Sequence, residues 1–261
     1  MVGHISRIFE LVAPPVLFSV FVAVVWHAVV VLFDIKPYLL PGPADVAAAA
    51  ATNLDVLIAA AGATARAAAA GFLLSFVVGF LIAVLFSQSR LAERSLYPYA
   101  IFLQTVPIVA IAPLIVLWIG HGTMGIVAVS FIISLFPIIA NTTSGLTSVD
   151  TELLDLFRLN EASRWQVLTK LRVPHAVPAM LTGARISTGL SVIGAIVGEF
   201  FAGYGAEEFG LGYYITMTNA QTKTPFLFAS VLFSTTLGLI FFVAIGALSR
   251  RILARWGDSP R

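Results

Sequence analysis

The sequence predicts an all-α polytopic membrane protein with six transmembrane helices, and two observations carry that prediction. Of the 261 residues, 59% are hydrophobic and only 11% are charged, whereas soluble domains carry about 25% charged residues. The apolar residues gather into six segments, each near the length of about 20 residues that a helix needs to cross a bilayer. A charged segment, residues 150–178, separates the fourth apolar segment from the fifth.

The whole chain is expected to be one membrane domain, residues 1–261, with its core at about 61–250. The loop of residues 34–60 contains an alanine run, and its helix propensity together with the spacing of its apolar residues predicts an interfacial helix. The predicted spans are residues 11–33, 67–86, 97–119, 123–143, 177–198 and 226–248. The first span is too long for the apolar part of a cleavable signal peptide. The chain has no cysteine, which excludes disulfides and cysteine nucleophiles.

The positions of lysine and arginine predict the orientation of the spans. If the N-terminus is cytoplasmic, eleven of these residues fall on the cytoplasmic side and only Lys36 and Lys223 on the outside. Positive charge in short loops marks the cytoplasmic side. We therefore expect both termini and the charged segment to be cytoplasmic. The eleven residues are Arg7, Arg90, Arg94, Arg158, Arg164, Lys170, Arg172, Arg250, Arg251, Arg255 and Arg261.

The charged segment is predicted to form two short helices joined by a tight turn. Asp150 can cap the first helix, and Leu153, Leu154 and Phe157 then share one face at helical spacing. A solvated loop would not need these signals.

The second helix is expected to begin at a capping box formed by Ser163 and Gln166. Trp165, Leu168 and Leu171 form its apolar stripe, and Pro174 is expected to end it.

This segment resembles the cytoplasmic coupling loop of ATP-binding cassette (ABC) importer permeases, which lies before their penultimate span. The family pattern is E-A-A, three residues, Gly, nine residues, then I-x-L-P. Here Asp155-Leu156-Phe157 stands at the E-A-A place, Glu161 at the Gly place and residues 171–174 at the I-x-L-P place, without a gap. The turn residue departs from the family, because glycine adopts a positive φ more easily than a residue with a Cβ. Asn160 tolerates that conformation better and is expected to take it over.

The resemblance extends over most of the chain. The chain is similar to the nitrate, sulfonate and taurine branch of the family, which includes permeases for thiamine-pyrimidine and riboflavin-type substrates. The matching motifs are Leu40-Pro41-Gly42-Pro43, Pro107 with Ala112-Pro113 and Trp118-Ile119-Gly120, Ala162-Ser163-Arg164-Trp165, Pro174 with Pro178 and Gly183, Glu199, and Gly210-Leu211-Gly212-Tyr213.

The resemblance implies a type I ABC importer permease fold in a bacterial inner membrane, with a coupling loop at residues 150–174 between the fourth and fifth spans. It implies two ATPase subunits that bind ATP and magnesium, a second copy of the same permease, and a periplasmic or lipid-anchored substrate-binding protein. This chain is expected to contact lipid but no nucleic acid, and to bind no cofactor itself. The residues expected to couple to the ATPase are Asp155, Leu156, Phe157, Asn160, Glu161, Ala162, Ser163, Arg164 and Pro174.

Three polar residues are candidates for the translocation pathway. Arg185 lies inside the fifth predicted span, where a charge faces a bundle interior or an aqueous path, or else snorkels to the interface. Glu199 ends the same span on the outer side, either lining an outer gate or lying at the interface. Gln104 lies in the third predicted span.

The sequence does not support catalysis by this chain. None of its three lysines follows a glycine, so it lacks the phosphate-binding motif G-x-x-x-x-G-K-[ST]. No nucleophile–base set or metal-ligand cluster is evident. A stand-alone secondary transporter or channel is the alternative, and it predicts ionisable pairs inside the spans or broken helices in matched halves. The polar residues of the predicted pathway do not discriminate between an anion and a vitamin precursor as the substrate.

Overall fold

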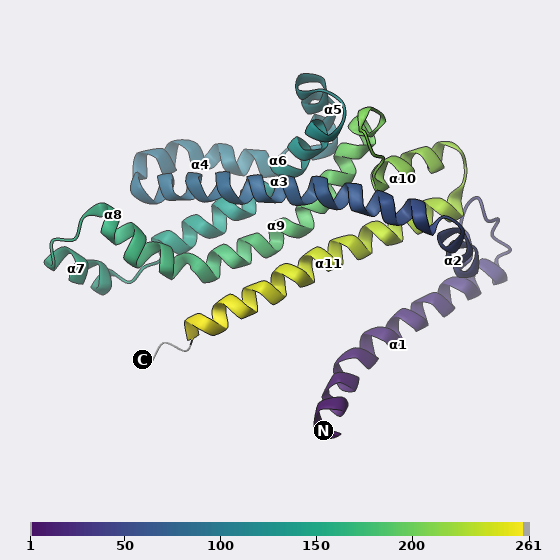
Figure 1. The fold of residues 1–261 in the computed structure, drawn as a ribbon, viewed down its shortest axis with the longest axis horizontal. Helices are drawn as coiled ribbons and strands as arrows, with labels where there is room; N and C mark the ends of the chain where they lie inside the picture. Colours follow the sequence, from purple (N-terminus) through teal and green to yellow (C-terminus); the bar gives the residue numbers. More distant parts are fainter. Residues whose placement is uncertain (1, 258–261) are drawn as a thin grey trace. The chain divides into compact units, whose positions relative to one another are not determined.

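The computed structural model describes the backbone of residues 2–257 and the side chains of residues 13–254 (Figure 1). The side chains of Arg7, Arg255 and Arg261, counted above for orientation, lie outside that part. All regular elements among residues 2–257 are helical: α1 Val2–Leu32, α2 Pro43–Thr52, α3 Leu54–Gln88, α4 Arg90–Thr105, α5 Ile108–Ile119, α6 Thr123–Thr147, α7 Thr151–Leu159, α8 Arg164–Val167, a π-helical turn Leu168–Arg172, α9 Val173–Ala202, a 3-10 turn Gly203–Gly205, α10 Leu211–Ala220 and α11 Thr224–Gly257.

The predicted fold class is confirmed. Within residues 2–257, five helical segments are long and apolar enough to cross a membrane, and a bent pair of helices gives a sixth if the pair is counted as one span. The five are Ala13–Leu32, Leu54–Gln88, Thr123–Thr147, Arg164–Gly205 and Thr224–Ala254, and the bent pair is α4 with α5.

The third span, predicted at about residues 97–119 with prolines interrupting it, is two helices, α4 and α5, with a break between them. α4 and α5 meet at 104°. The break falls at Val106 and Pro107, which both have extended backbone conformations. Proline disfavours the helical conformation of the residue before it and has no N–H to donate. By contrast, Pro113 and Pro137 lie inside α5 and α6.

The predicted loop of residues 34–60 is mostly helical, and α3 begins at Leu54, well before the predicted start of the second span at residue 67. Alanine is a strong helix former but a weak marker of apolarity, so a search for apolar runs places this boundary too late. α2 begins at Pro43, and the Asp45 carboxylate accepts the Gly42 N–H at 3.0 Å.

The described residues form two compact units. The first comprises residues 2–57 and 214–232, and the second residues 58–213 and 233–257. Within the first unit, the rings of Trp26 and Phe228 lie 5.8 Å apart, and the Thr224 hydroxyl donates to the Tyr38 carbonyl at 2.8 Å.

The core of the second unit is the close packing of α6 against α9. Hydroxyl groups donate to carbonyls across this contact, Ser130 to Ser191 at 2.8 Å and Ser187 to Ser134 at 2.7 Å. Between α9 and α6, small residues let the two backbones approach, and a Cβ on Gly194 would lie 2.7 Å from the Ser130 Cα. Inside a bilayer, such packing and hydrogen bonding replace the hydrophobic effect as the force that joins helices.

α7 and α8 lie at one end of this second unit, and α5 and the segment before α10 lie at the other (Figure 1). Candidate sites therefore fall at its two ends and along α9 between them.

Candidate functional site

Both caps predicted for the charged segment are confirmed. The Asp150 carboxylate accepts the Glu152 N–H at 3.1 Å at the start of α7. Before α8, the Ser163 hydroxyl accepts the Gln166 N–H at 3.3 Å and the Gln166 side-chain oxygen accepts the Ser163 N–H at 2.8 Å. Side-chain caps satisfy backbone donors that a helix cannot satisfy itself. Two short sequences therefore become rigid helices with a defined turn between them.

α7 carries apolar side chains on two sides. Leu154 and Phe157 are half-buried against the rest of the protein. Leu153, Leu156 and Leu159 recur every three residues and are 44%, 53% and 82% exposed. They form an apolar stripe along α7 that other parts of the chain do not cover. We call these three residues the α7 stripe.

The turn after α7 corrects the expectation for Asn160. Its φ is −89°, whereas Glu161 has a φ of +52°. The Glu161 N–H donates to the Arg158 carbonyl at 2.9 Å and the Ala162 N–H to the Phe157 carbonyl at 3.0 Å. These two bonds define a Schellman motif, whose geometry places the left-handed residue one position after the C-cap. Because Asn160 is the C-cap, the strained position falls on Glu161.

Replacing Glu161 with glycine is expected to stabilise this turn by about 1 kcal/mol, because glycine adopts a positive φ without a Cβ clash. Hydrogen exchange of the Glu161 and Ala162 amides should then slow by roughly fivefold. Asn160→Gly is the matched control. It removes the bond from the Asn160 side chain to the Leu156 carbonyl at a residue with an ordinary φ. Slowing of exchange in the control alone would contradict the assignment.

Pro174 does not end the second helix, contrary to the prediction. The helix runs from Arg164 to Gly205, through the π-helical turn Leu168–Arg172 and into α9. In that turn the Val173 N–H bonds to the Leu168 carbonyl, five residues earlier. The wider turn lies immediately before the proline, whose ring would otherwise crowd the carbonyl four residues back. The second helix of the charged segment is therefore continuous with the fifth span.

The other predicted coupling residues lie around the turn between α7 and α8. Asp155 and Arg158 form an exposed ion pair at 2.8 Å on α7. Ala162 is half-buried, and Ser163 and Arg164 are exposed at the start of α8. Trp165, predicted in the apolar stripe of the second helix, is 70% exposed, whereas Leu168 is buried.

Arg185 is exposed on α9, and its guanidinium carbon lies 4.2 Å from the centre of the Phe242 ring on α11. Such a cation–π contact is attractive where water is scarce.

Glu199 lies fourteen residues beyond Arg185 on the same helix, about 20 Å along its axis. The structure therefore does not bring these two predicted pathway residues together. Gln104 is exposed in the last turn of α4, next to the break before α5.

Glu199 is a buried residue that holds the segment before α10. Its side chain is 1% exposed, and one carboxylate oxygen accepts the Gly212 N–H at 2.7 Å. The Leu211 N–H donates to the Thr64 hydroxyl of α3 at 2.9 Å. A Cβ at Gly210 or Gly212 would collide with the Glu199 side chain. The motif Gly210-Leu211-Gly212 thus lets the backbone close onto the carboxylate, and the partner Thr64 had no signal in the sequence.

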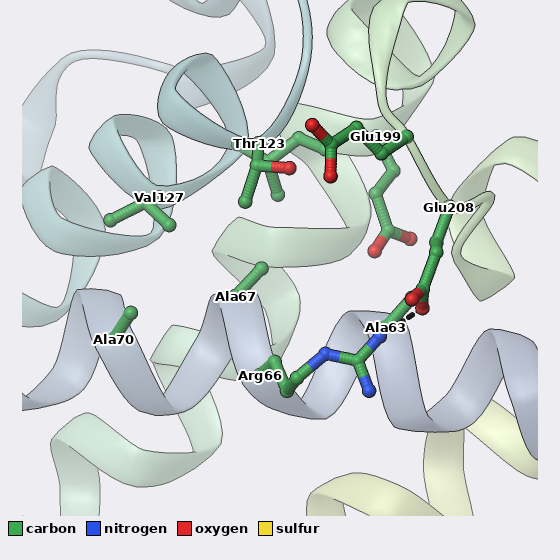
Figure 2. Close-up of a pocket in the computed structure, with 10 residues that line it drawn as sticks. Ala63, Arg66, Ala67, Ala70, Thr123, Val127, Glu199 and Glu208 are labelled. Atoms are coloured by element: carbon green, nitrogen blue, oxygen red, sulfur yellow. Dashed lines mark hydrogen bonds and ion pairs between the residues drawn. The ribbon is translucent and has the colours of Figure 1, made fainter.

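A cavity of about 350 Å³ opens beside Glu199 between α3 and α6 (Figure 2). Arg66 of α3 pairs with Glu208 across its mouth. Sequence reasoning missed this pair because the two residues are far apart in the chain. Among the described residues no group of acids and histidines could hold a metal ion. The lining residues are Ala63, Arg66, Ala67, Ala70, Thr123, Ile126, Val127, Glu199, Glu207 and Glu208.

The apolar spans, the capped helix pair and its continuity with the fifth span define a membrane component of a transport system. Residues 75–254 match the family model described as "Binding-protein-dependent transport system inner membrane component". The chain belongs to this family of multi-pass inner-membrane proteins, the permeases of ABC importers.

The chain aligns with two curated relatives over most of their length and with a third over about two thirds of its length. The chain is 36% identical to the formylaminopyrimidine transport permease protein ThiX of Halalkalibacterium halodurans, covering 93% of this chain and 95% of that one. It is 34% identical to the riboflavin transport system permease protein RibX of Chloroflexus aurantiacus, covering 90% and 87%. The chain is 31% identical to the putative aliphatic sulfonates transport permease protein SsuC of Bacillus subtilis, covering 74% of this chain and 68% of that one.

A solved structure supports the fold independently. An inward-facing crystal form of the MetNI methionine ABC transporter contains a chain that matches with a TM-score of 0.66. The match covers 77% of this chain and 98% of that chain at 16% identity, so it bears on the fold alone.

Proposed function

We propose that this permease couples to a separate ATPase through α7 and the turn to α8, and that two copies of it form one translocation pathway. Each copy inserts α7 into a groove on one ATPase subunit. The ATPase subunits bind ATP with magnesium and hydrolyse the ATP. Because α8 continues into α9, movement of the docked helix tilts the fifth span. If the spans have two stable arrangements, movement of the docked helix at one end favours one of them, and this is enough to produce alternating access.

The α7 stripe is the observation that supports this proposal most strongly. Leu153, Leu156 and Leu159 are exposed on a helix that belongs to the charged, non-spanning part of the chain. The membrane does not account for them, and apolar residues gathered on one face mark a protein contact. We place both termini and α7 on the cytoplasmic side, from the lysine and arginine count.

We propose that Arg185 lines the pathway and that its contact with Phe242 holds α9 against α11 in one state. Arg185→Ala is expected to reduce substrate transport by reconstituted complex at least tenfold while ATPase co-purification is unchanged. Arg185→Lys keeps the charge and should recover part of the rate, since lysine also binds aromatic faces. Unchanged transport in Arg185→Ala would remove this residue from the pathway.

For the substrate, we propose a small polar heterocycle or organic anion delivered by a periplasmic or lipid-anchored binding protein. The named substrates of the relatives span both classes: formylaminopyrimidine, riboflavin and aliphatic sulfonates. Glu199 would hold in place the segment before α10, which the binding protein would contact.

Co-purification tests the proposal. The tagged permease is purified from its native membrane in mild detergent and its partners are identified by mass. We expect an ATPase at one subunit per permease, together with a binding protein, whose ligands are then screened by thermal shift. Substrate transport by the purified chain alone in vesicles would instead indicate a secondary transporter or channel.

A further inference from the structure

We propose that the arginine-lined cavity between the end of α3 and the α7–α8 turn binds a phosphate group. Two adjoining cavities lie there, of about 270 Å³ and 460 Å³, and they share Ser87, Leu154, Arg158 and Arg172. The smaller one is just under the range of about 300–1,000 Å³ that holds drug-sized ligands, which suits a headgroup rather than a larger molecule.

Three arginines line each of the two cavities. Arg158, Arg164 and Arg172 line the smaller cavity, whose lining contains no acidic residue. Arg90 joins Arg158 and Arg172 in the larger one, with Glu93 and Asp155 as the acids. These four arginines come from α4, α7, α8 and the π-helical turn, so the tertiary fold and not local sequence gathers them.

Arg172 gives the second, independent observation. Its Nη1 atom donates to the Ser87 carbonyl at the end of α3, which fixes the guanidinium in place. Its Nε atom is buried and has no hydrogen-bond partner. A buried charged donor without an acceptor is costly, and Arg172 also lines both cavities.

A phosphate suits these donors better than a carboxylate does. The planar guanidinium binds phosphate oxygens through paired N–H groups, and several arginines can share the three or four oxygens of one phosphate. Asp155 neutralises only Arg158, through the 2.8 Å ion pair. The remaining arginines would repel one another without a bound anion.

The position favours a lipid phosphate over a free one. α3 is one of the candidate spans and ends at Gln88, and we place Ser87 and Gln88 where this span meets the headgroup region. Anionic lipids gather basic residues at the cytoplasmic leaflet. This part of the inference rests on the proposed orientation of α7. A bound headgroup would brace the α7–α8 turn against the end of α3.

The test uses the full chain purified with its ATPase partner. Native mass spectrometry measures retained phosphatidylglycerol, and thermal shift measures stabilisation by inorganic phosphate in lipid-free detergent and by phosphatidylglycerol against phosphatidylcholine in nanodiscs. Arg158→Gln and Arg172→Gln should each reduce retained phosphatidylglycerol at least fivefold and remove the thermal shift. Arg172→Lys keeps the charge and separates anion binding from loss of folding. Arg251→Gln, an exposed arginine on α11 outside both cavities, is the matched control and should change neither readout.

The two arms separate the sources of phosphate. Stabilisation by phosphatidylglycerol but not by 10-fold excess inorganic phosphate assigns the cavity to a lipid headgroup, and the reverse assigns it to a free phosphate. Equal lipid retention in Arg158→Gln and Arg251→Gln overturns the proposal. So does loss of the ATPase from Arg158→Gln with phosphate binding intact, because the cavity would then receive an acidic group of the ATPase. The ATPase mass in the same spectra shows separately whether the proposed coupling holds.

Discussion

Leu156→Asp is expected to reduce co-purification of the ATPase more than tenfold while the permease still inserts and folds. Leu156 is the middle residue of the α7 stripe, and its side chain is 53% exposed, so the substitution removes little packing inside the permease itself. In the complex, the new carboxylate would be buried in an apolar groove without a partner. That burial costs several kcal/mol, and each 1.4 kcal/mol lowers affinity tenfold.

The control for this variant is Thr151→Asp. Thr151 is exposed at the first position of α7 and outside the stripe, and an acid there favours the helix N-terminus. It adds the same charge to the same helix, so a general electrostatic effect on docking would appear in both variants. Two further substitutions, Asp155→Arg and Phe157→Asp, should also prevent docking, although half-buried Phe157 adds a folding contribution. Normal ATPase recovery with Leu156→Asp would show that α7 is not the contact.

The local features of the coupling segment could be predicted because they depend on neighbouring residues. The Asp150 cap and the Ser163–Gln166 capping box each involve partners within three residues, and both form as expected. The apolar spans follow from composition and length in the same way. Such signals need no knowledge of the rest of the fold.

The errors arose where one signal was judged without its context. Pro174 was expected to end a helix, yet it lies within a continuous one, whereas Pro107, with the same chemistry, lies at a 104° break. The difference is the π-helical turn before Pro174, which residue preferences do not predict. Asn160 was favoured for the positive φ on residue preference, yet the Schellman geometry assigns that position to Glu161.

The contacts of Glu199 could not be predicted because its partners are distant in sequence. The acid and the Gly210–Gly212 motif were both recognised as features, but nothing in the sequence joined them. In the structure the Glu199 carboxylate accepts the Gly212 N–H while Thr64 accepts the Leu211 N–H. The glycines are needed for that close approach and not for a turn of their own.

The packing of α6 against α9 leads to the second large prediction. Gly194→Val is expected to destabilise the permease by at least about 3 kcal/mol, and to lower its Tm by roughly 6–12 °C. A Cβ at Gly194 would lie 2.7 Å from the Ser130 Cα and 2.5 Å from the Ile133 side chain. α6 cannot move away without cost, because the Ser130 hydroxyl donates to the Ser191 carbonyl across the same contact.

Two comparisons make this prediction specific to the crossing of α6 and α9. Gly189→Val changes the same residue type on the same helix, but a Cβ at Gly189 has no other atom within 4 Å, so its Tm should stay within about 2 °C of the parent. Adding Ile133→Ala to Gly194→Val removes the side-chain part of the clash and leaves the part with the Ser130 backbone. If backbone contact sets the crossing, this second change recovers less than half of the lost Tm. Full recovery would mean that a side chain, and not the close approach of the two backbones, requires glycine at this position.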